Sequence, residues 1–307
     1  MNIKNLTRHG ILFHQFHSPK LFYQSPGSLD KDTFYKFIKC NIKKIRNPEE
    51  FLYSKSSSKI FSITFDDGLK SQYKIALDVL ENFNIKAFFF IFSESLENKH
   101  FTVENIRYFS YKFFKDRDHF YRSFFKTYEE CFSNKLIFDD KFSQHLIKKY
   151  KKQSKYYSKN DIIFKIARDN YINEKNYKKV MLKMFNNKKV DIKLLTKKLY
   201  MSKNEIKDIS NLGHIVGLHS HSHNHKNHQF SFKEELDDYK KNKKILEKII
   251  KKKIYCLSYP FGNYTINSEK ILNKLNIKYA FCKNSVTTNV FKNKNYCLPR
   301  ENISNLL

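Results

Sequence analysis

Two kinds of hydrophobic pattern divide the chain. Short continuous apolar runs, rich in β-branched and aromatic residues, predict strands that are buried on both faces. They occupy residues 9–14, 59–65, 87–92, 214–220, 253–260 and 278–283. Apolar residues at three- and four-residue spacing predict helices between these runs, at 70–81, 202–213, 232–250 and 267–276.

The order of these elements indicates the fold class. A strand at 59–65, a helix at 70–81 and a strand at 87–92 form a βαβ unit, which implies a parallel sheet. The same alternation resumes at residue 202, where a Ser-Lys-Asn-Glu capping box opens a helix. We therefore predict an α/β protein with a barrel-like or layered architecture.

Residues 96–201 show a different pattern of aromatic and charged residues. Segments 104–116, 119–132 and 142–152 carry aromatic residues between charges at helical spacing, which predicts amphipathic helices. We predict that residues 1–95 and 202–307 form the α/β domain and that residues 96–201 form a mostly helical insertion. We expect this insertion to shape a substrate cleft or an oligomer interface.

The chain is strongly basic, with 59 Lys and Arg against 30 Asp and Glu and a formal net charge of +29. Such a charge suits a polyanion, an anionic membrane surface or a phosphorylated substrate. The lysines are scattered, however, and no Arg-rich or Gly-aromatic motif accompanies them. This scatter favours a composition bias, so we predict no specific nucleic-acid partner.

Cysteine usage and hydropathy bear on the compartment. The five cysteines form no CxxC pair, and their odd number and wide spacing argue against a disulfide framework. The first residues, MNIKNLTRHGILFHQF, contain no apolar stretch of signal-peptide length. No window reaches about 18 uncharged apolar residues, so no transmembrane segment is expected. These features predict a cytoplasmic protein with reduced thiols.

Two adjacent carboxylates, Asp66 and Asp67, follow the strand predicted at 59–65. Active sites of α/β barrels lie at the carboxyl ends of strands. One aspartate could bind a metal there while the other remains free as a base. In an alternative interpretation, Asp67 only caps the helix at 70–81.

A histidine tract, GHIVGLHSHSHNH, spans residues 213–225. His219 and His223 are four residues apart at the end of a predicted strand. Two imidazoles and one carboxylate with an open position suit Zn²⁺, and Co²⁺, Ni²⁺ or Fe²⁺ as alternatives. A tract that collects metal without function is the competing interpretation.

Three motifs in a fixed order resemble the polysaccharide deacetylase family, the NodB-homology or carbohydrate esterase family 4 group. They are TFDDG at 64–68, HSHSH at 219–223 and YPFG at 259–262. The resemblance covers roughly residues 59–95 and 202–300. It implies a distorted (β/α)7-type barrel and metal-dependent removal of acetyl groups from N-acetylated sugars.

The resemblance also implies roles for individual residues. Asp66 matches the general base, and Asp67, His219 and His223 match the metal ligands. The backbone N–H of Phe261 matches the donor that stabilises the oxyanion. The remaining histidines of the tract and its surroundings are interpreted as non-ligands: His221, His225 and His228.

The third motif departs from the family pattern. The family's R-P-P-Y is replaced by Ser258-Tyr259-Pro260-Phe261, so its arginine is missing. Arg300, in a Leu-Pro-Arg sequence, is our candidate to supply the guanidinium from another strand, with an ordinary surface residue as the alternative interpretation. We expect Tyr259 and Pro260 to contact the substrate.

The general acid is the least defined role, because no L-x-H motif follows residue 262. His14, in Leu12-Phe13-His14 on the first predicted strand, is the candidate, since a barrel brings its first strand against its last. A structural histidine is the alternative at this position, and His17 is the nearest competitor.

The sequence thus predicts a hydrolase that removes an N-acetyl group from an amino sugar, with a nucleotide- or lipid-linked precursor of surface polysaccharide as the expected substrate. Hydrolysis of a non-sugar C–N bond, of the allantoinase or cyclic-imide type, is the enzymatic alternative. A catalytically silent sugar-binding protein and a charge-driven nucleic-acid binder are the alternatives from other classes.

Overall fold

The computed structural model describes residues 7–19, 21–97, 102–138, 144–148, 158–283 and 291–307. It divides into two compact units, one formed by Met1–Asn98 with Lys197–Leu307 and the other by Lys99–Thr196. The predicted segment 142–152 lies mostly outside the described residues. Within the described part of the chain, no helix is long and apolar enough to cross a membrane.

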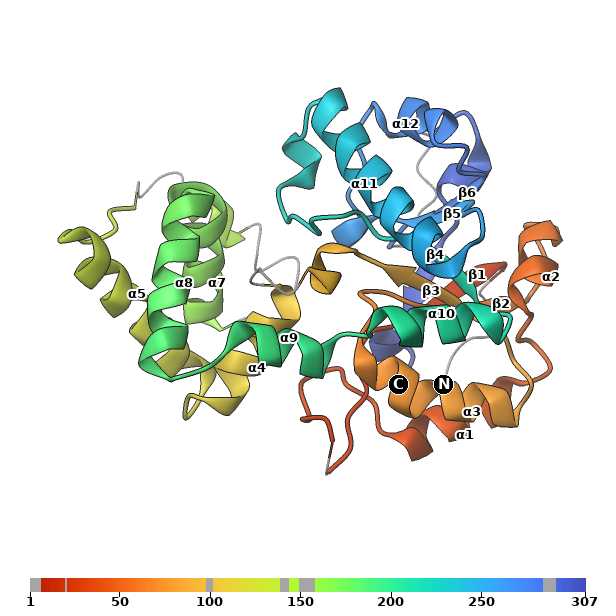
Figure 1. Cartoon of the computed structure of the whole chain (residues 1–307), viewed down its shortest axis with the longest axis horizontal. Helices are drawn as coiled ribbons and strands as arrows, with labels where there is room; N and C mark the ends of the chain where they lie inside the picture. Colours follow the sequence, from red (N-terminus) through yellow and green to blue (C-terminus); the bar gives the residue numbers. More distant parts are fainter. Residues whose placement is uncertain (1–6, 20, 98–101, 139–143, 149–157, 284–290) are drawn as a thin grey trace. The chain divides into compact units, whose positions relative to one another are not determined.

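The first unit is built on seven parallel strands in the order β6-β5-β4-β3-β2-β1-β7 (Figure 1). Their bounds are β1 His9–Phe13, β2 Phe61–Phe65, β3 Phe88–Ile91, β4 Ile215–Leu218, β5 Cys256–Ser258, β6 Tyr279–Phe281 and β7 Arg300–Asn302. Six of these strands fall inside the apolar runs predicted from the sequence, and β7 is the addition.

The last strand closes the sheet into a barrel. Gly10 of β1 lies opposite Arg300 of β7, and Leu298, just before β7, forms a parallel bridge with Phe281 of β6. The Leu298 N–H donates to the Ala280 carbonyl at 2.8 Å, and the Cys282 N–H donates to the Leu298 carbonyl at 3.0 Å. Residues 298–302 therefore join the two ends of the sheet, and the predicted (β/α)7-type barrel is confirmed.

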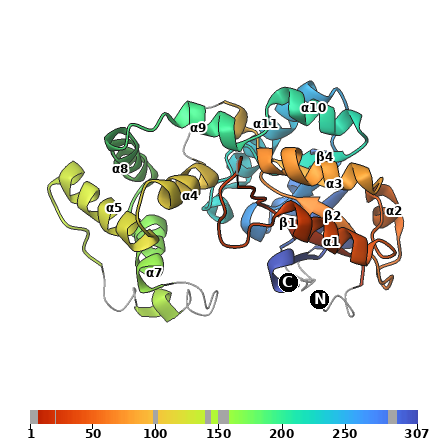
Figure 2. The ribbon, with the colours of Figure 1, turned by 90° about the horizontal axis from the view of Figure 1, so that it is seen from below.

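Helices surround the barrel strands. They are α1 Lys31–Asn41, α2 Pro48–Tyr53, α3 Leu77–Asn82, α10 Lys203–Asn211, α11 Phe232–Ile250 and α12 Ser268–Lys274. The views in Figures 1 and 2 place α1 beside α3 and α10 beside α11. The predicted helix at 70–81 is realised as a π-helical turn, Gln72–Ala76, that continues into α3. The predicted capping box of α10 is present, with Ser202 and Glu205 bonded reciprocally.

Alternate residues of the strands enter different hydrophobic clusters, as the two-residue period of a strand requires. Phe89 and Ile91 of β3 belong to the large cluster that includes the surrounding helices. Phe88 and Phe90 belong instead to a smaller cluster with Phe281 of β6. The continuous apolar runs are thus explained, because these strands bury both of their faces.

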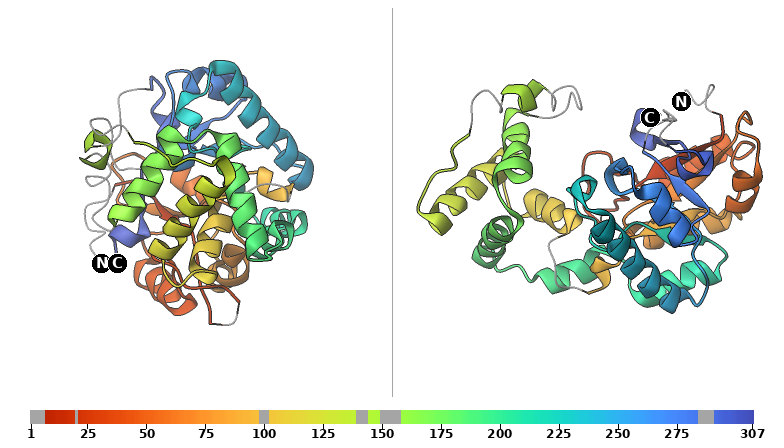
Figure 3. Two further views of the ribbon diagram at one scale, coloured as in Figure 1. Left: turned by 90° about the vertical axis from the view of Figure 1, so that its left-hand side faces the viewer. Right: turned by 90° about the horizontal axis from the view of Figure 1, so that it is seen from above.

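The second unit is helical. Its helices are α4 Val103–Lys112, α5 Arg117–Phe132, α7 Lys159–Ile166, α8 Glu174–Asn187 and the first part of α9 Ile192–Leu199. Helix α5 lies against α7 and α8, as the yellow to green helices of Figure 3 show. Aromatic contacts hold this unit together, such as the stacked rings of Phe109 and Phe185, whose centroids are 3.9 Å apart.

Candidate active site

Polar side chains of the barrel unit gather where four of its strands end, two on each side of β3. His14 follows β1, Asp66 and Asp67 follow β2, His219 follows β4, and Ser258 is the last residue of β5. Because all the strands are parallel, their carboxyl ends lie at the same edge of the barrel. Residues that are far apart in the sequence therefore meet there.

Asp67 turns sharply away from its strand, because its φ of 74° lies in the left-handed region and Gly68 follows with φ 66°. This turn brings the Asp67 Oδ1 to 3.4 Å from the His219 Nε2 and 3.2 Å from the His223 Nε2. The helical residues that follow begin at Lys70, three positions beyond Asp67. Asp67 therefore faces the two histidines and does not act as a helix cap.

These three residues could hold a metal ion. Asp67, His219 and His223 each offer one ligand atom, and these atoms lie within 4.8 Å of one another. Among the residues that the structure describes, they form the only such group of three or more His, Cys, Asp or Glu side chains. The three predicted ligands are thus brought together by the fold.

His219 is held in the orientation that a ligand needs. Its ring is buried, and its Nδ1 donates to the Ser258 carbonyl at 2.8 Å. Because a carbonyl can only accept, Nδ1 carries a proton, and Nε2 is the ring nitrogen that faces Asp67. The Asn242 side chain accepts a hydrogen bond from the His219 backbone N–H at 3.2 Å.

The HSHSH segment, residues 219–223, bends so that its middle histidine, His221, lies apart from His219 and His223. Ser220 and His223 both adopt positive φ, 65° and 48°. The His223 ring contacts the rings of Phe92 and Phe261, with centroid distances of 5.1 and 4.6 Å. His221 lies elsewhere, with its Nδ1 2.9 Å from the Ser93 Oγ.

Two further histidines of the tract also lie outside the group of three. His214 bonds to the Ala87 N–H and to Glu81. His225 is partly buried.

Asp66 occupies a different environment from Asp67, although the two are adjacent. Its carboxylate is buried and receives two hydrogen bonds from the Arg300 guanidinium, at 2.7 and 2.8 Å. The Ser258 hydroxyl donates to the same carboxylate at 3.2 Å, and Arg300 in turn donates to this hydroxyl at 2.7 Å. Arg300 is fully buried, so it is not a surface residue.

The charges around the aspartates change their titration. Burial by itself would raise the pKa of Asp66, but the nearby Arg300, His219 and His14 outweigh burial, and its pKa is lowered. Burial acts in the same direction on Asp67, and the opposing effect of His223, His219 and His14 holds the pKa of Asp67 well below its usual range. Both carboxylates are therefore ionised at neutral pH.

His14 lies next to this pair because β1 and β2 are parallel and in register, with Phe13 opposite Phe65. Its electrostatic effect reaches both Asp66 and Asp67. Its competitor His17 makes a hydrogen bond of 2.9 Å through its Nδ1 with the Ser28 hydroxyl.

The third motif, YPFG at 259–262, lies partly in the interior of the barrel unit. Tyr259 is 1% exposed, and its hydroxyl donates to the Tyr296 carbonyl at 3.0 Å. Pro260 is buried as well. These residues form part of the interior, and their contact with a substrate stays a prediction. Phe261 is 38% exposed, has a positive φ of 59° and contacts the His223 ring.

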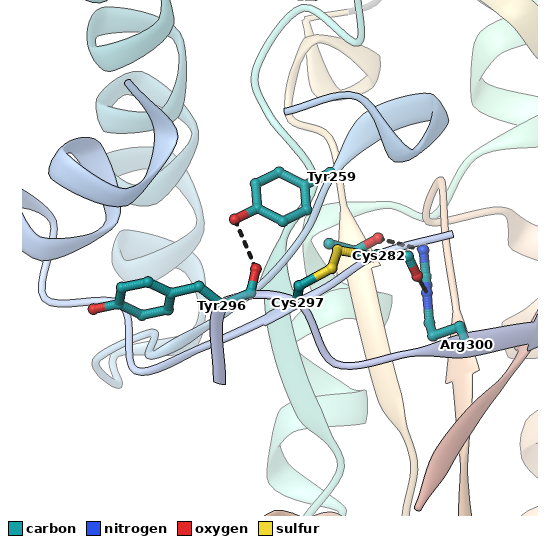
Figure 4. The surroundings of a disulfide bond; sticks show 6 residues. Tyr259, Cys282, Tyr296, Cys297 and Arg300 are labelled. Carbon is teal, nitrogen blue, oxygen red and sulfur yellow. Dashed lines mark hydrogen bonds between the residues drawn. A yellow bond between two sulfur atoms is a disulfide. The ribbon is translucent and has the colours of Figure 1, made fainter. Parts of the chain in front are cut away.

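The prediction of reduced cysteines is wrong for one pair. Cys282 and Cys297 form a disulfide, with a Cα–Cα distance of 5.2 Å, and Figure 4 shows it beside Tyr259, Tyr296 and Arg300. The spacing of the cysteines did not indicate this pairing, because the two residues are brought together by the bridge between Phe281 and Leu298 that closes the barrel.

Sequence reasoning also missed Ser258, which contacts both halves of the site: its carbonyl accepts from His219 and its hydroxyl contacts Asp66 and Arg300. The available signal was the substitution in the third motif. A small residue at position 258 leaves room for a guanidinium that arrives from another strand.

The fold and the site together define a class: an α/β-barrel protein that carries an Asp-His-His group and a paired carboxylate at the carboxyl ends of its strands. The chain belongs to the polysaccharide deacetylase family, whose family model matches residues 53–111 and 164–280, more than half of its length. It is thus a hydrolase that acts on amide bonds. No curated protein matches the chain significantly.

Solved structures of deacetylases share the fold at low sequence identity. The Streptococcus pyogenes deacetylase PplD, solved with acetate, has a TM-score of 0.55 at 13% identity, covering 97% of this chain and 92% of that one. IcaB from Ammonifex degensii has a TM-score of 0.51 at 14% identity, covering 95% and 89%. A de-N-acetylase from Aggregatibacter actinomycetemcomitans has 0.52 at 12% identity, covering 95% and 93%.

Proposed function

We propose that this chain is a divalent-metal-dependent hydrolase that removes the N-acetyl group from an amino sugar. One observation carries the proposal. Asp67 and the two histidines that it faces each offer one ligand atom, close enough together to bind a single ion. The carboxylate of the adjacent Asp66 is hydrogen-bonded to Arg300. A binding protein would need neither a second ionised carboxylate nor a buried arginine to orient it.

Asp67, His219 and His223 would hold the metal. The donor set fits, because the hydrogen bond from His219 Nδ1 to the Ser258 carbonyl leaves Nε2 as the nitrogen that can bind an ion. Two imidazoles and one carboxylate suit Zn²⁺, with Co²⁺, Ni²⁺ and Fe²⁺ as alternatives. When bound, such an ion polarises a carbonyl oxygen and lowers the pKa of a coordinated water towards about 7.

Asp66 is the proposed general base. Arg300 keeps its carboxylate ionised and fixes both oxygens, so that the carboxylate can accept a proton from the attacking water. The guanidinium arrives from β7 instead of from the third motif, whose position 258 is a serine. The missing arginine of the motif is therefore compensated from another strand.

His14 is the proposed general acid. It follows the strand next to Asp66 and lies close enough to both aspartates to lower their pKa values, so it is suited to protonate the leaving amine. The backbone N–H of Phe261, beside the His223 ring, is the proposed donor to the oxyanion. Loss of one such donor typically costs about 3 kcal/mol of transition-state stabilisation.

The proposed substrate is a precursor of surface polysaccharide, linked to a nucleotide or a lipid. The net charge of +29 is compatible with a phosphorylated carrier. The predicted cytoplasmic location stays a prediction, and the disulfide between Cys282 and Cys297 argues against it, because disulfides persist mainly in oxidising compartments.

Acetate release tests this proposal. Purified chain, with its metal content measured, is incubated with nucleotide-linked N-acetylhexosamines, oligomers of N-acetylglucosamine and cyclic imides. We expect acetate from an acetylated sugar, loss of activity with a chelator and recovery with Zn²⁺. Turnover of cyclic imides alone would overturn the assignment to sugars.

A further inference from the structure

Arg300 has a third partner besides Asp66 and Ser258. Its Nε donates to the Cys282 carbonyl at 3.0 Å, as the dashed line at Arg300 in Figure 4 shows. The two terminal nitrogens are used on Asp66 and Ser258. A guanidinium is planar, so the bond at Nε and the three bonds from the terminal nitrogens together fix its plane. The Cys282 carbonyl thus helps to orient the Arg300 guanidinium towards Asp66.

Cys282 is itself tied to a second segment of the chain. Its side chain is bonded to Cys297, and its backbone N–H donates to the Leu298 carbonyl. Both cysteines are buried. The disulfide therefore lies directly beside the bridge between Phe281 and Leu298 that closes the barrel. Cys282 is one residue beyond β6, and Cys297 is three residues before Arg300.

The Cys297 side of the disulfide is anchored to the barrel. The Tyr296 carbonyl accepts from the Tyr259 hydroxyl at 3.0 Å, and the Tyr296 hydroxyl donates to Asn273 of α12 at 2.6 Å. The Tyr259 ring stacks on Phe291, with an interplanar angle of 4°. This anchoring also gives a reason for the burial of Tyr259. Because Cys282 is covalently bonded to Cys297, this anchoring also restricts the position of Cys282.

We propose that the Cys282–Cys297 disulfide is a positioning device for Arg300: it fixes the Cys282 carbonyl that orients the guanidinium, and so holds the Asp66 carboxylate in place. The proposal rests on the proposed role of Asp66 as base. Without the covalent link, a shift of the carbonyl leaves the Nε–H of a buried arginine without its acceptor, and the guanidinium reorients at the expense of its bonds to Asp66.

A double-mutant cycle tests this coupling. Its four proteins are the wild type, the Cys282→Ala/Cys297→Ala variant, Arg300→Lys and the combination of all three substitutions. Lysine keeps the charge but cannot bond to Asp66 and to the Cys282 carbonyl with one planar group. The exposed Cys40 provides a control, Cys40→Ala. For each protein, kcat, KM and the denaturant midpoint are measured, with kcat determined well below the unfolding temperature.

We expect removal of the disulfide to lower kcat by roughly 3- to 100-fold in the wild type, because small misplacements of catalytic groups are costly. KM should stay within about twofold. In the Arg300→Lys background, the same removal should change kcat by less than about twofold, because coupled residues are non-additive. Cys40→Ala should match the wild type.

An equal loss of kcat in both backgrounds would overturn the proposal, since the disulfide would then act independently of Arg300. If the cysteine variant fails to fold, the intact protein is reduced with dithiothreitol, which is oxidised to its cyclic disulfide as Cys282 and Cys297 become thiols. The kcat is then compared in the wild type and Arg300→Lys. If the wild type releases no acetate, the proposed function fails independently of the coupling. The coupling is then tested by the stability measurements alone: additive effects of the disulfide and Arg300 on the denaturant midpoint would overturn it.

Discussion

Asp66 and Asp67 are adjacent, yet they belong to different parts of the site. The left-handed backbone at Asp67 turns its carboxylate towards His219 and His223, whereas the carboxylate of Asp66 meets Arg300. The same functional group therefore receives two roles from its surroundings: the neighbours of Asp67 are potential metal ligands, and the neighbour of Asp66 is a fixed positive charge.

Amide substitutions at the two aspartates should separate their roles. We expect Asp67→Asn to lose bound metal and activity together. Asp66→Asn should keep the metal but lower kcat by at least about 100-fold, because an amide cannot accept the proton. Metal per chain by elemental analysis and kcat under saturating substrate check both results. Full activity in Asp66→Asn would remove the base assignment, and loss of metal in His221→Gln would remove our choice of ligands.

His214 makes folding sensitive to acid. Burial is the main cause that lowers its pKa, to about 4, with Glu81 opposing and Lys86 assisting. The unfolded chain takes up a proton near pH 6.5, but the folded chain does so only near pH 4. The unfolded state thus binds more protons between these values, and stability is lost as the pH falls through this window.

Replacement of His214 by Gln should remove this part of the acid sensitivity. Between pH 7.5 and pH 5, we expect the free energy of unfolding of the wild type to fall by about 2 kcal/mol more than that of His214→Gln. Urea unfolding at the two pH values measures the difference. Parallel losses in the two proteins would mean that His214 titrates alike in the folded and unfolded chains.

Among the elements, β1 and β7 form the part of the barrel that delivers Arg300. Gly10 of β1 lies opposite Arg300 of β7. A Cβ at position 10 would lie only 2.9 Å from the Arg300 Cγ and 3.1 Å from the Thr64 Cγ2. The missing side chain of Gly10 is therefore what lets the stem of Arg300 cross the barrel interior.

Gly10→Ala should therefore reduce activity beyond its effect on stability. We expect a loss of about 1–3 kcal/mol in the free energy of unfolding from overpacking. A fall in kcat of roughly tenfold or more should accompany it, because Arg300 is displaced from Asp66. The control is Gly213→Ala, which strains a backbone with φ 89° at the opposite end of β4 from His219. Equal kcat in the two variants, measured while both are folded, would contradict the role of Gly10.

At the scale of the whole molecule, the candidate site is contained in one of the two units. Every residue with a proposed role lies in the unit formed by residues 1–98 and 197–307. The large hydrophobic cluster of the barrel also draws only on residues of this unit. Residues 99–196 form their own compact unit, with its own aromatic contacts.

Excision of residues 99–196 should therefore leave the metal site intact. We expect a chain in which a flexible Gly/Ser linker of roughly ten residues replaces this unit to fold and to bind as much metal as the full chain. Circular dichroism and metal analysis check this, with Asp67→Asn in the shortened chain as the control that binds none. A shortened chain that is folded but metal-free would show that the second unit supports the site. A comparison of kcat and KM between the two lengths would show what this unit adds to catalysis.

The sequence by itself determined the elements and their order, because strand and helix periodicity are local properties of the chain. The helix predicted at 232–250 is α11 with the same bounds, and six strands arose from their apolar runs. The sequence also singled out Asp67, His219 and His223, since each directly follows a predicted strand or belongs to a motif that resembles the deacetylase family.

Only the tertiary structure decided how the remaining residues are used. Arg300 reaches Asp66 from 234 positions away, Cys282 pairs with Cys297, and the hydroxyl of Tyr259 donates to the Tyr296 carbonyl. Each of these contacts depends on the closure of the barrel, which sets the last strand against the first. Closure is a long-range property that no local pattern encodes, so the sequence could name Arg300 as a candidate but could not place it.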